Sequence, residues 1–186
     1  MRKPNAKDRI LETAGALFFQ RGYSGVGINE IIEKAGTAKA SFYQYYPSKE
    51  SLCEAWLRAL HDQSENYRRV LLEEPGPSRE KVARYFDRLG KFLVESDFRG
   101  CPYSNTGALS EANCPGIAEQ IREHKEATRN FFRILASRSI DEHAKADETG
   151  DRIFVLYSGA TAESQNLKEL WPVTVARSAA VDLLPI

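Results

Sequence analysis

Apolar residues recur at helical spacing along almost the whole chain, and this pattern restricts the fold more than any other feature of the sequence. Ile10, Ala14 and Leu17 share one face of a helix, and Phe86 and Leu89 repeat the pattern further along. No long segment alternates apolar and polar residues with the period of two that a half-buried strand needs. The sequence therefore predicts an all-α fold.

Capping residues, glycines and prolines divide this pattern into separate helices. The first helix should begin after Asn5, whose side chain can cap it, and should end at Gly22. Ser48 can cap a long helix that continues to about residue 72. The other helices are expected at about 28–35 and 39–45, around 82–93, as one short helix between 100 and 115, around 117–135, and at about 147–167 and 172–184.

The two short helices at 28–35 and 39–45 are joined by a tight turn at Gly36, which is typical of a helix-turn-helix. We therefore expect two domains. Residues 1–48 form a three-helix helix-turn-helix domain, and residues 49–186 form a second domain of roughly six helices.

The charge of the chain is unevenly distributed. It has 26 Lys and Arg and 26 Asp and Glu, so bulk charge does not attract it to nucleic acid. Residues 1–50, however, carry eight basic and five acidic side chains, a net charge of +3, which leaves −3 on the rest. This asymmetry fits an N-terminal module that faces DNA.

The sequence carries no membrane or secretion signal that we can identify. Residues 1–10 have no apolar segment of signal-peptide type behind their basic residues, and no run of about 18 apolar residues follows. The three cysteines, Cys53, Cys101 and Cys114, form no CxxC pair. We therefore expect a soluble, cytoplasmic protein with reduced thiols and no membrane partner.

The sequence shows no set of residues whose spacing is typical of a catalytic site. His61, His124 and His143 have no metal-binding spacing, and there is no GxSxG motif. The glycine-rich segment 22–27 lacks the GK[ST] ending of a phosphate-binding loop and follows a helix rather than a strand. We expect neither enzymatic activity nor a metal or cofactor. The alternative to a DNA-binding protein is a helical interaction scaffold whose helix-turn-helix no longer binds DNA.

The segment GINEIIEKAGTAKASFYQYYPSKESLCEAW, residues 27–56, resembles the helix-turn-helix signature of the TetR family of transcriptional regulators. Its pieces occur in the family's order and at its helical phases, from Gly22-Tyr23 through Ala35-Gly36 to Tyr46-Pro47-Ser48-Lys49-Glu50. The resemblance implies a homodimer that binds a palindromic operator through the helix at 39–45, and a regulatory domain that responds to a small-molecule effector.

The resemblance also implies which residues contact DNA. Base-facing positions fall on Lys39, Ala40 and Gln44, and positions that usually contact the sugar-phosphate backbone fall on Ser41, Tyr43, Tyr45 and Lys49. Phe42 and Tyr46 are expected to pack inside the small domain. The chain departs from the family at Gly27, where Ser or Thr commonly caps the second helix and contacts a phosphate.

The last two expected helices carry small residues, among them Gly159 and Ala179. Small residues let helices approach closely, so these helices are candidates for the dimer interface. Packing of the two helices within one chain explains the same residues.

The segment 99–105, with Cys114 further on, resembles a branch of the family that contains the regulator of N-ethylmaleimide reductase, in which a cysteine at the position of Cys101 senses electrophiles or oxidants. The partner lysine of that branch aligns with Gln165 here. The alternatives are an inert buried thiol and a non-covalent effector held by Phe86, Tyr103, Asn105 and Phe131, although aromatic side chains at helical spacing serve a core equally well.

Overall fold

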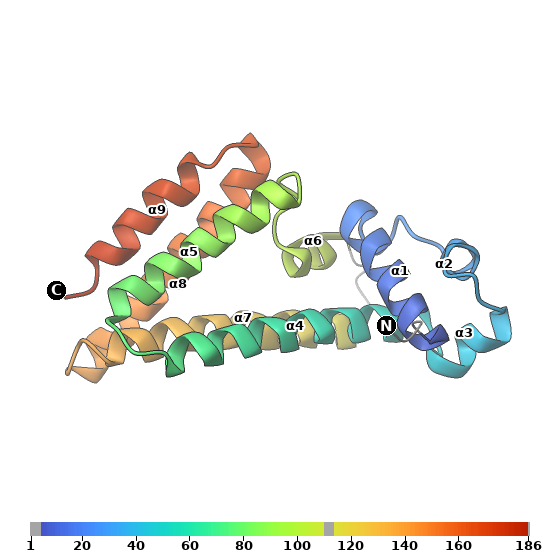
Figure 1. The fold of residues 1–186 in the computed structure, drawn as a ribbon, viewed down its shortest axis with the longest axis horizontal. Helices are drawn as coiled ribbons and strands as arrows, with labels where there is room; N and C mark the ends of the chain where they lie inside the picture. Colours follow the sequence, from blue (N-terminus) through green and yellow to red (C-terminus); the bar gives the residue numbers. More distant parts are fainter. Residues whose placement is uncertain (1–4, 110–113, 186) are drawn as a thin grey trace. The chain divides into compact units, whose positions relative to one another are not determined.

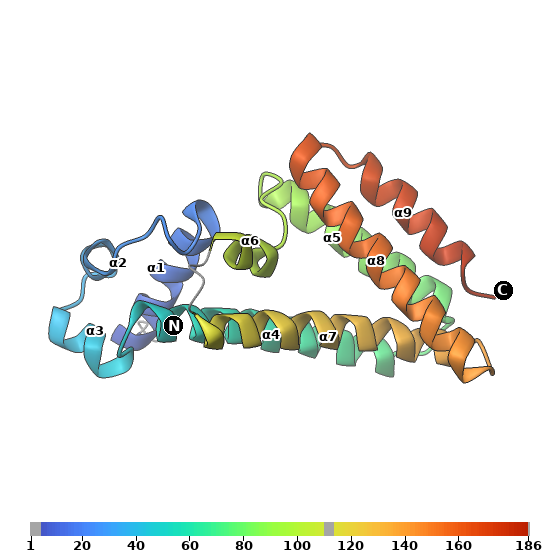
Figure 2. The same ribbon diagram turned by 180° about the vertical axis from the view of Figure 1, so that it is seen from behind.

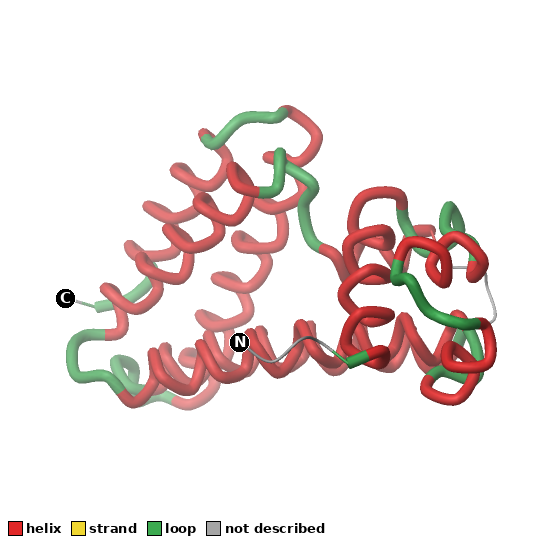
Figure 3. The backbone as a smooth tube through the Cα atoms, turned by 45° about the vertical axis from the view of Figure 1, so that its right-hand side comes forward, coloured by secondary structure: helices red, strands yellow, loops and turns green. Residues whose placement is uncertain are grey.

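The computed structural model describes residues 5–109 and 114–185, and these residues form helices joined by loops (Figure 3). Figures 1 and 2 show the helices from opposite sides. The all-α prediction is confirmed. The helices of the described residues are α1 (Ala6–Arg21), α2 (Ile28–Lys34), α3 (Lys39–Tyr45), α4 (Lys49–Glu73), α5 (Ser78–Glu95), α6 (Pro102–Leu109), α7 (Pro115–Ser137), α8 (His143–Leu167) and α9 (Trp171–Asp182).

The chain forms two compact units, which we describe separately. The first unit comprises residues up to 63 together with 102–123, and the second comprises 64–101 and 124 onward. Helices α4 and α7 each contribute residues to both units.

The first unit is built around α1, which packs against α2, α3 and α6. The N-terminus of α1 is capped by Asn5, whose Oδ1 accepts a hydrogen bond from the Asp8 amide at 2.9 Å. Its C-terminus ends at Gly22, which has φ of 77° and donates to the Phe18 carbonyl at 2.8 Å. A side chain is strained at such a φ, so glycine ends the helix here.

The core of the first unit comes from all the helices around α1. Ile10 of α1, Ile31 of α2, Phe42 of α3 and Leu52 of α4 are all completely buried. The N-terminus of α4 is held by reciprocal bonds, in which the Ser51 amide donates to Ser48 Oγ at 3.0 Å and the Ser48 amide donates to Ser51 Oγ at 3.1 Å.

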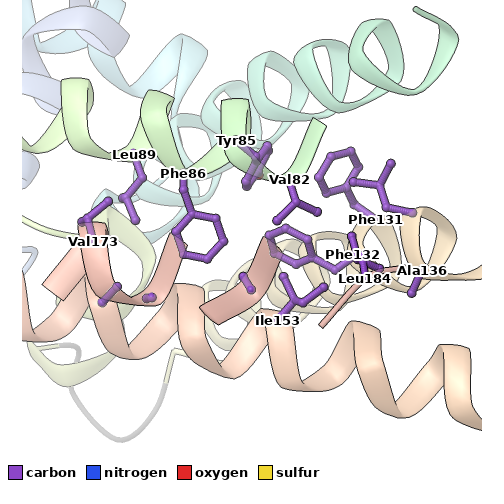
Figure 4. Packing of buried hydrophobic residues seen from close by; sticks show 14 of the residues in the cluster. Val82, Tyr85, Phe86, Leu89, Phe131, Phe132, Ala136, Ile153, Val173 and Leu184 are labelled. Carbon is purple, nitrogen blue, oxygen red and sulfur yellow. The ribbon is translucent and has the colours of Figure 1, made fainter. Parts of the chain in front are cut away.

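The core of the second unit lies among α5, α7, α8 and α9 (Figure 4). Its centre is a set of touching aromatic rings. The ring centroids of Tyr85 and Phe131 are 4.8 Å apart, and those of Phe86 and Tyr157 are 5.5 Å apart. Contacts of this kind stabilise a core beyond the area that they bury. Helix α9 packs against both α5 and α8.

No helix of residues 5–109 and 114–185 combines the length and apolar composition that crossing a lipid bilayer requires.

Candidate functional site

Helix α3 presents one exposed polar face because its opposite face is anchored in the core. Phe42 is fully buried, and its ring centroid lies 6.4 Å from that of Tyr46, which is also buried. Lys39, Ala40, Tyr43 and Gln44 have the spacing of a single helical face, and all are exposed. The structure thus places Phe42 and Tyr46 in the core, as expected.

The remaining residues of α3 widen this exposed face. Tyr45 is exposed and Ser41 is half-buried. Tyr43 and Tyr45 leave 42% and 39% of their surfaces accessible. The helix contains one cation, Lys39, and no acid. Such a surface can donate to base edges and phosphates without repelling the charge of DNA.

The turn between α2 and α3 is fixed from α1. Gly36 has φ of 59°, which favours glycine. The Arg9 guanidinium donates to the carbonyls of Ala35 at 3.2 Å and Gly36 at 3.5 Å. This role of Arg9 could not be predicted from the sequence, since nothing in the local pattern indicates that a residue 26 positions before Ala35 faces the turn.

The N-terminus of α2 has no side-chain cap. Gly27 occupies the N-cap position in an extended conformation, and no side chain bonds to the first amides. Glu30 in the first turn pairs with Arg21 at 2.7 Å and with Lys34 at 3.2 Å. The hydrogen bond from Arg21, followed by that from Lys34, lowers the pKa of the Glu30 carboxyl.

Lys49 lies at the beginning of α4 and has partners within the protein. Its ammonium donates to the carbonyls of Tyr23 at 3.2 Å and Val26 at 3.1 Å. It also lies 4.3 Å from the centroid of the Tyr23 ring, a cation–π contact. The predicted phosphate contact of Lys49 is untested, but these bonds already use two of its three donors.

The predicted effector residues are divided between the two units. In the first unit, Tyr103 is buried and its hydroxyl donates to the Leu57 carbonyl at 2.9 Å, while Asn105 is half-buried. In the second unit, Phe86 and Phe131 are buried in the aromatic core. Their role as an effector site remains a prediction.

Cys101 has a cationic neighbour in the second unit. The Lys125 ammonium donates to Cys101 Sγ at 3.7 Å, and the thiol is half-buried. Gln165, which aligns with the branch's partner lysine, packs instead over Gly100, where a Cβ would overlap its side chain. Lys125 could not be predicted as a neighbour of Cys101, because it lies on α7, 24 residues further along the chain.

A second cation in this unit is completely enclosed. Arg68 is 1% exposed, and its guanidinium donates to Glu65 Oε2 at 2.7 Å and to Thr128 Oγ1 at 3.1 Å. A buried charge persists only when hydrogen bonds compensate its lost hydration. Arg68 therefore joins α4 to α7 within the second unit.

Groups of three or more His, Cys, Asp or Glu that could hold a metal ion do not occur among residues 5–109 and 114–185.

Comparison with known proteins identifies relatives of the N-terminal segment and of the whole chain. Residues 10–56 match the family described as "Bacterial regulatory proteins, tetR family". The HTH-type transcriptional regulator LmrA of Bacillus subtilis is 25% identical over 186 residues, which cover 97% of each protein. The HTH-type transcriptional repressor NemR of Escherichia coli is 29% identical over 139 residues, which cover 74% of this chain and 68% of NemR.

Solved structures share the fold. The crystal structure of the reduced form of Escherichia coli NemR has a TM-score of 0.81 at 20% identity and covers 97% of this chain and 98% of NemR. A TetR transcriptional regulator from Legionella pneumophila has a TM-score of 0.88 at 18% identity and covers 100% of both chains. At these identities the likeness concerns the fold.

Proposed function

The chain belongs to the TetR family of bacterial regulatory proteins, and we propose that it is a repressor that binds a palindromic operator as a homodimer and leaves it when an effector acts. It is a DNA-binding transcriptional regulator and not an enzyme. The proposed place of action is the cytoplasm, where bacterial operator DNA lies.

The observation that carries the proposal is the exposed face of α3. The base-reading residues are Lys39, Ala40 and Gln44, which lie on the exposed side of a helix whose buried side is fixed by Phe42. Lys can donate to guanine, Gln can pair with adenine, and the Ala methyl can contact the methyl group of thymine. Ser41, Tyr43 and Tyr45 carry hydroxyl groups that can donate hydrogen bonds to phosphates.

The homodimer is proposed to form through α8 and α9. Val155 on α8 is 66% exposed, and Trp171 and Val175 on α9 are 54% and 59% exposed. Gly159 lies four residues after Val155 on α8, and Ala179 lies four residues after Val175 on α9, so each shares a helix face with that valine. Both small residues are exposed, and a Cβ at Gly159 would meet no atom within 4 Å. Apolar side chains beside small ones suit close helix packing against a second copy.

The domains proposed for these two tasks are residues 1–48 for DNA binding, and residues 49–186 for dimerisation and effector sensing. Two candidates remain for the sensing step. One is modification of Cys101 beside Lys125, which is favoured by their 3.7 Å contact. The other is a non-covalent effector, held either by Phe86 and Phe131 of the second unit or by Tyr103 and Asn105 of the first. In the former case the effector must displace ring contacts of Phe86 and Phe131 in the core.

A binding selection from random double-stranded oligonucleotides tests the proposal. The purified full chain should enrich a palindrome whose half-sites are about one helical turn, or a multiple of it, apart. A selection that enriches no sequence would favour the scaffold alternative. The variant Gln44→Ala should lose the preference for the selected sequence while it keeps its affinity for random duplexes, because Gln44 is placed at a base and not at a phosphate.

A further inference from the structure

The loop between α1 and α2 is held by cations from outside it. The loop runs from Gly22 to Gly27, and its residues Tyr23 and Val26 are 7% and 2% exposed. The carbonyls of buried residues such as Tyr23 and Val26 need donors, and helix or strand ladders do not supply them here. The donors are Arg21, which bonds to the Gly25 carbonyl, and Lys49, which bonds to the carbonyls of Tyr23 and Val26.

The bond to Val26 lies directly before α2. Because Gly27 gives α2 no side-chain cap, nothing in its own N-cap residue fixes where the helix begins. The neighbouring Val26 carbonyl is instead fixed by Lys49, 23 residues later in the sequence. Lys49, in the first turn of α4, therefore fixes the backbone directly before the first helix of the helix-turn-helix.

The Tyr23 ring completes the attachment. The Lys49 ammonium lies 4.3 Å from the centroid of the Tyr23 ring, and the centroid of the Phe18 ring of α1 lies 5.9 Å from that of Tyr23. Lys49 thus contacts the loop both through its carbonyls and through a buried ring. Two of its three N–H donors are already used by these carbonyls.

We propose that Lys49 is a positioning residue of the DNA-binding unit: it fixes the loop 22–27 and the start of α2 on α4, and so sets the orientation of the recognition surface, rather than binding a phosphate itself. The expected effect on DNA binding rests on the proposed function, whereas the attachment of the loop rests on the contacts of Lys49 alone. The two roles differ measurably. A phosphate ligand acts on all sequences alike and contributes to the salt dependence of binding, whereas a misplaced recognition helix loses mainly sequence-specific contacts.

The first test uses the full chain without DNA. Hydrogen exchange of the amides in residues 23–32 should be about tenfold faster in Lys49→Ala, because a buried hydrogen bond of ordinary strength protects by about that factor. Lys49→Arg should restore the protection, since a guanidinium can donate to both carbonyls and stack on Tyr23. The matched control is Lys34→Ala, which removes the same charge from an exposed ion pair with Glu30 and should leave these amides unchanged. Unchanged exchange in Lys49→Ala would overturn the proposal.

The second test compares the duplex recovered by selection with a random-sequence duplex over a series of salt concentrations. Lys49→Ala should weaken binding to the selected duplex about tenfold more than binding to the random duplex, with the same salt slope as the unmutated protein. Lys49→Arg should restore the ratio. An equal loss on both duplexes with a slope reduced by about one ion identifies Lys49 as a phosphate ligand and overturns the proposal. Faster exchange with an unchanged ratio also overturns it, since Lys49 then serves stability alone. If selection recovers no duplex, the proposed function fails, while the exchange result still decides whether Lys49 holds the loop.

Discussion

The ammonium of Lys125, on α7, lies 3.7 Å from the sulfur of Cys101, and both residues belong to the second unit. The other two cysteines have different surroundings. Cys53 is completely buried, and burial raises the pKa of its thiol to about 12. The Cys114 sulfur lies 4.0 Å from the Tyr23 hydroxyl. Cys101 is half-buried and accepts a hydrogen bond from an ammonium, whereas Cys53 is enclosed, so Cys101 is better placed than Cys53 to react.

N-ethylmaleimide should therefore modify Cys101 before Cys53 at neutral pH. Lys125→Gln should slow the labelling of Cys101 by about three- to tenfold, since the neighbouring positive charge is lost. Lys145→Gln removes an exposed lysine from α8 and serves as the control. Peptide mapping by mass spectrometry after timed labelling measures each thiol. Equal rates for Cys101 in the unmutated protein and in Lys125→Gln would show that Lys125 does not activate it.

The same reagent decides between the two sensing candidates. If modification of Cys101 is the signal, treatment should release the selected duplex from the unmutated protein and from Cys53→Ser and Cys114→Ser. It should not release the duplex from Cys101→Ser. A coupling free energy of about 1–3 kcal/mol corresponds to a loss of affinity of roughly 5- to 150-fold. Release that persists in Cys101→Ser rules out Cys101 as the required sensor, and an absence of release in all four proteins favours a non-covalent effector.

Lys39 should read one base pair in each half-site. Lys39→Ala should reduce discrimination at that pair by about 1–3 kcal/mol and leave the other positions unchanged, because a base-edge contact is local. Binding to a set of duplexes with single base-pair changes measures this loss. Equal losses on the selected and random duplexes would assign Lys39 to phosphate binding.

A large residue at Gly159 should separate the proposed dimer. Gly159→Trp places an indole on the exposed face of α8, where helices of two copies are expected to meet closely. We expect a monomer that binds the selected duplex at least tenfold more weakly, because two recognition helices no longer share a rigid spacing. Lys91→Trp, at an exposed position of α5, should stay dimeric. Sedimentation velocity at micromolar concentration gives the result, and an unmutated protein that is monomeric there would refute the interface.

Much of the fold could be predicted from the sequence because helix signals are local. Asn5, Gly22 and Ser48 mark helix ends that the structure has at the same places. Helix α8 is an exception, since it begins at His143 and not near residue 147. Its N-cap, Glu142, makes no side-chain cap bond, so the sequence offers no start signal there.

The arrangement around the candidate sites could not be predicted, because it depends on contacts between distant residues. Lys49 reaches Tyr23, Arg9 reaches Ala35, and Lys125 reaches Cys101, each across more than 20 positions. The spacing of apolar residues determines which face of a helix is buried. It does not determine which other segment a cationic side chain of that helix will contact. For the same reason it could not be predicted that Tyr103 and Phe86 lie in different compact units.

Asp151 should make the stability of the second unit depend on acid pH. Its carboxylate accepts two hydrogen bonds each from Arg129 and Arg133, at 2.7–2.8 Å, and these bonds hold its pKa well below the usual range. A carboxyl whose pKa is lower in the folded state contributes stability above its unfolded pKa of about 3.9, and this contribution is lost as the pH falls through the folded value.

Asp151→Asn should therefore lower the free energy of unfolding by about 1 kcal/mol at pH 7, a value reduced for solvent screening of these partly exposed groups. The difference from the unmutated protein should shrink as the pH is lowered from about 4 toward 2. Urea unfolding at a series of pH values measures it, and Asp62→Asn, at an exposed position of the other unit, should show little difference at any pH. A difference that stays constant down to pH 2 would contradict the role of the ionised carboxylate.

Gly150 and Gly159 allow a matched test of how α7 and α8 pack. Both lie within α8, where alanine is favoured over glycine by about 1 kcal/mol. A Cβ at Gly150 would lie 2.5 Å from Cα of Arg133 and 2.6 Å from its backbone nitrogen, whereas one at Gly159 would meet no atom within 4 Å. Since the backbone of α7 cannot give way as a side chain can, Gly150→Ala should destabilise the protein by about 1–3 kcal/mol, and Gly159→Ala should be neutral or slightly stabilising. Thermal unfolding of both variants at one protein concentration measures this, and a Gly150→Ala protein that melts at or above the unmutated temperature would show that α7 and α8 do not approach so closely.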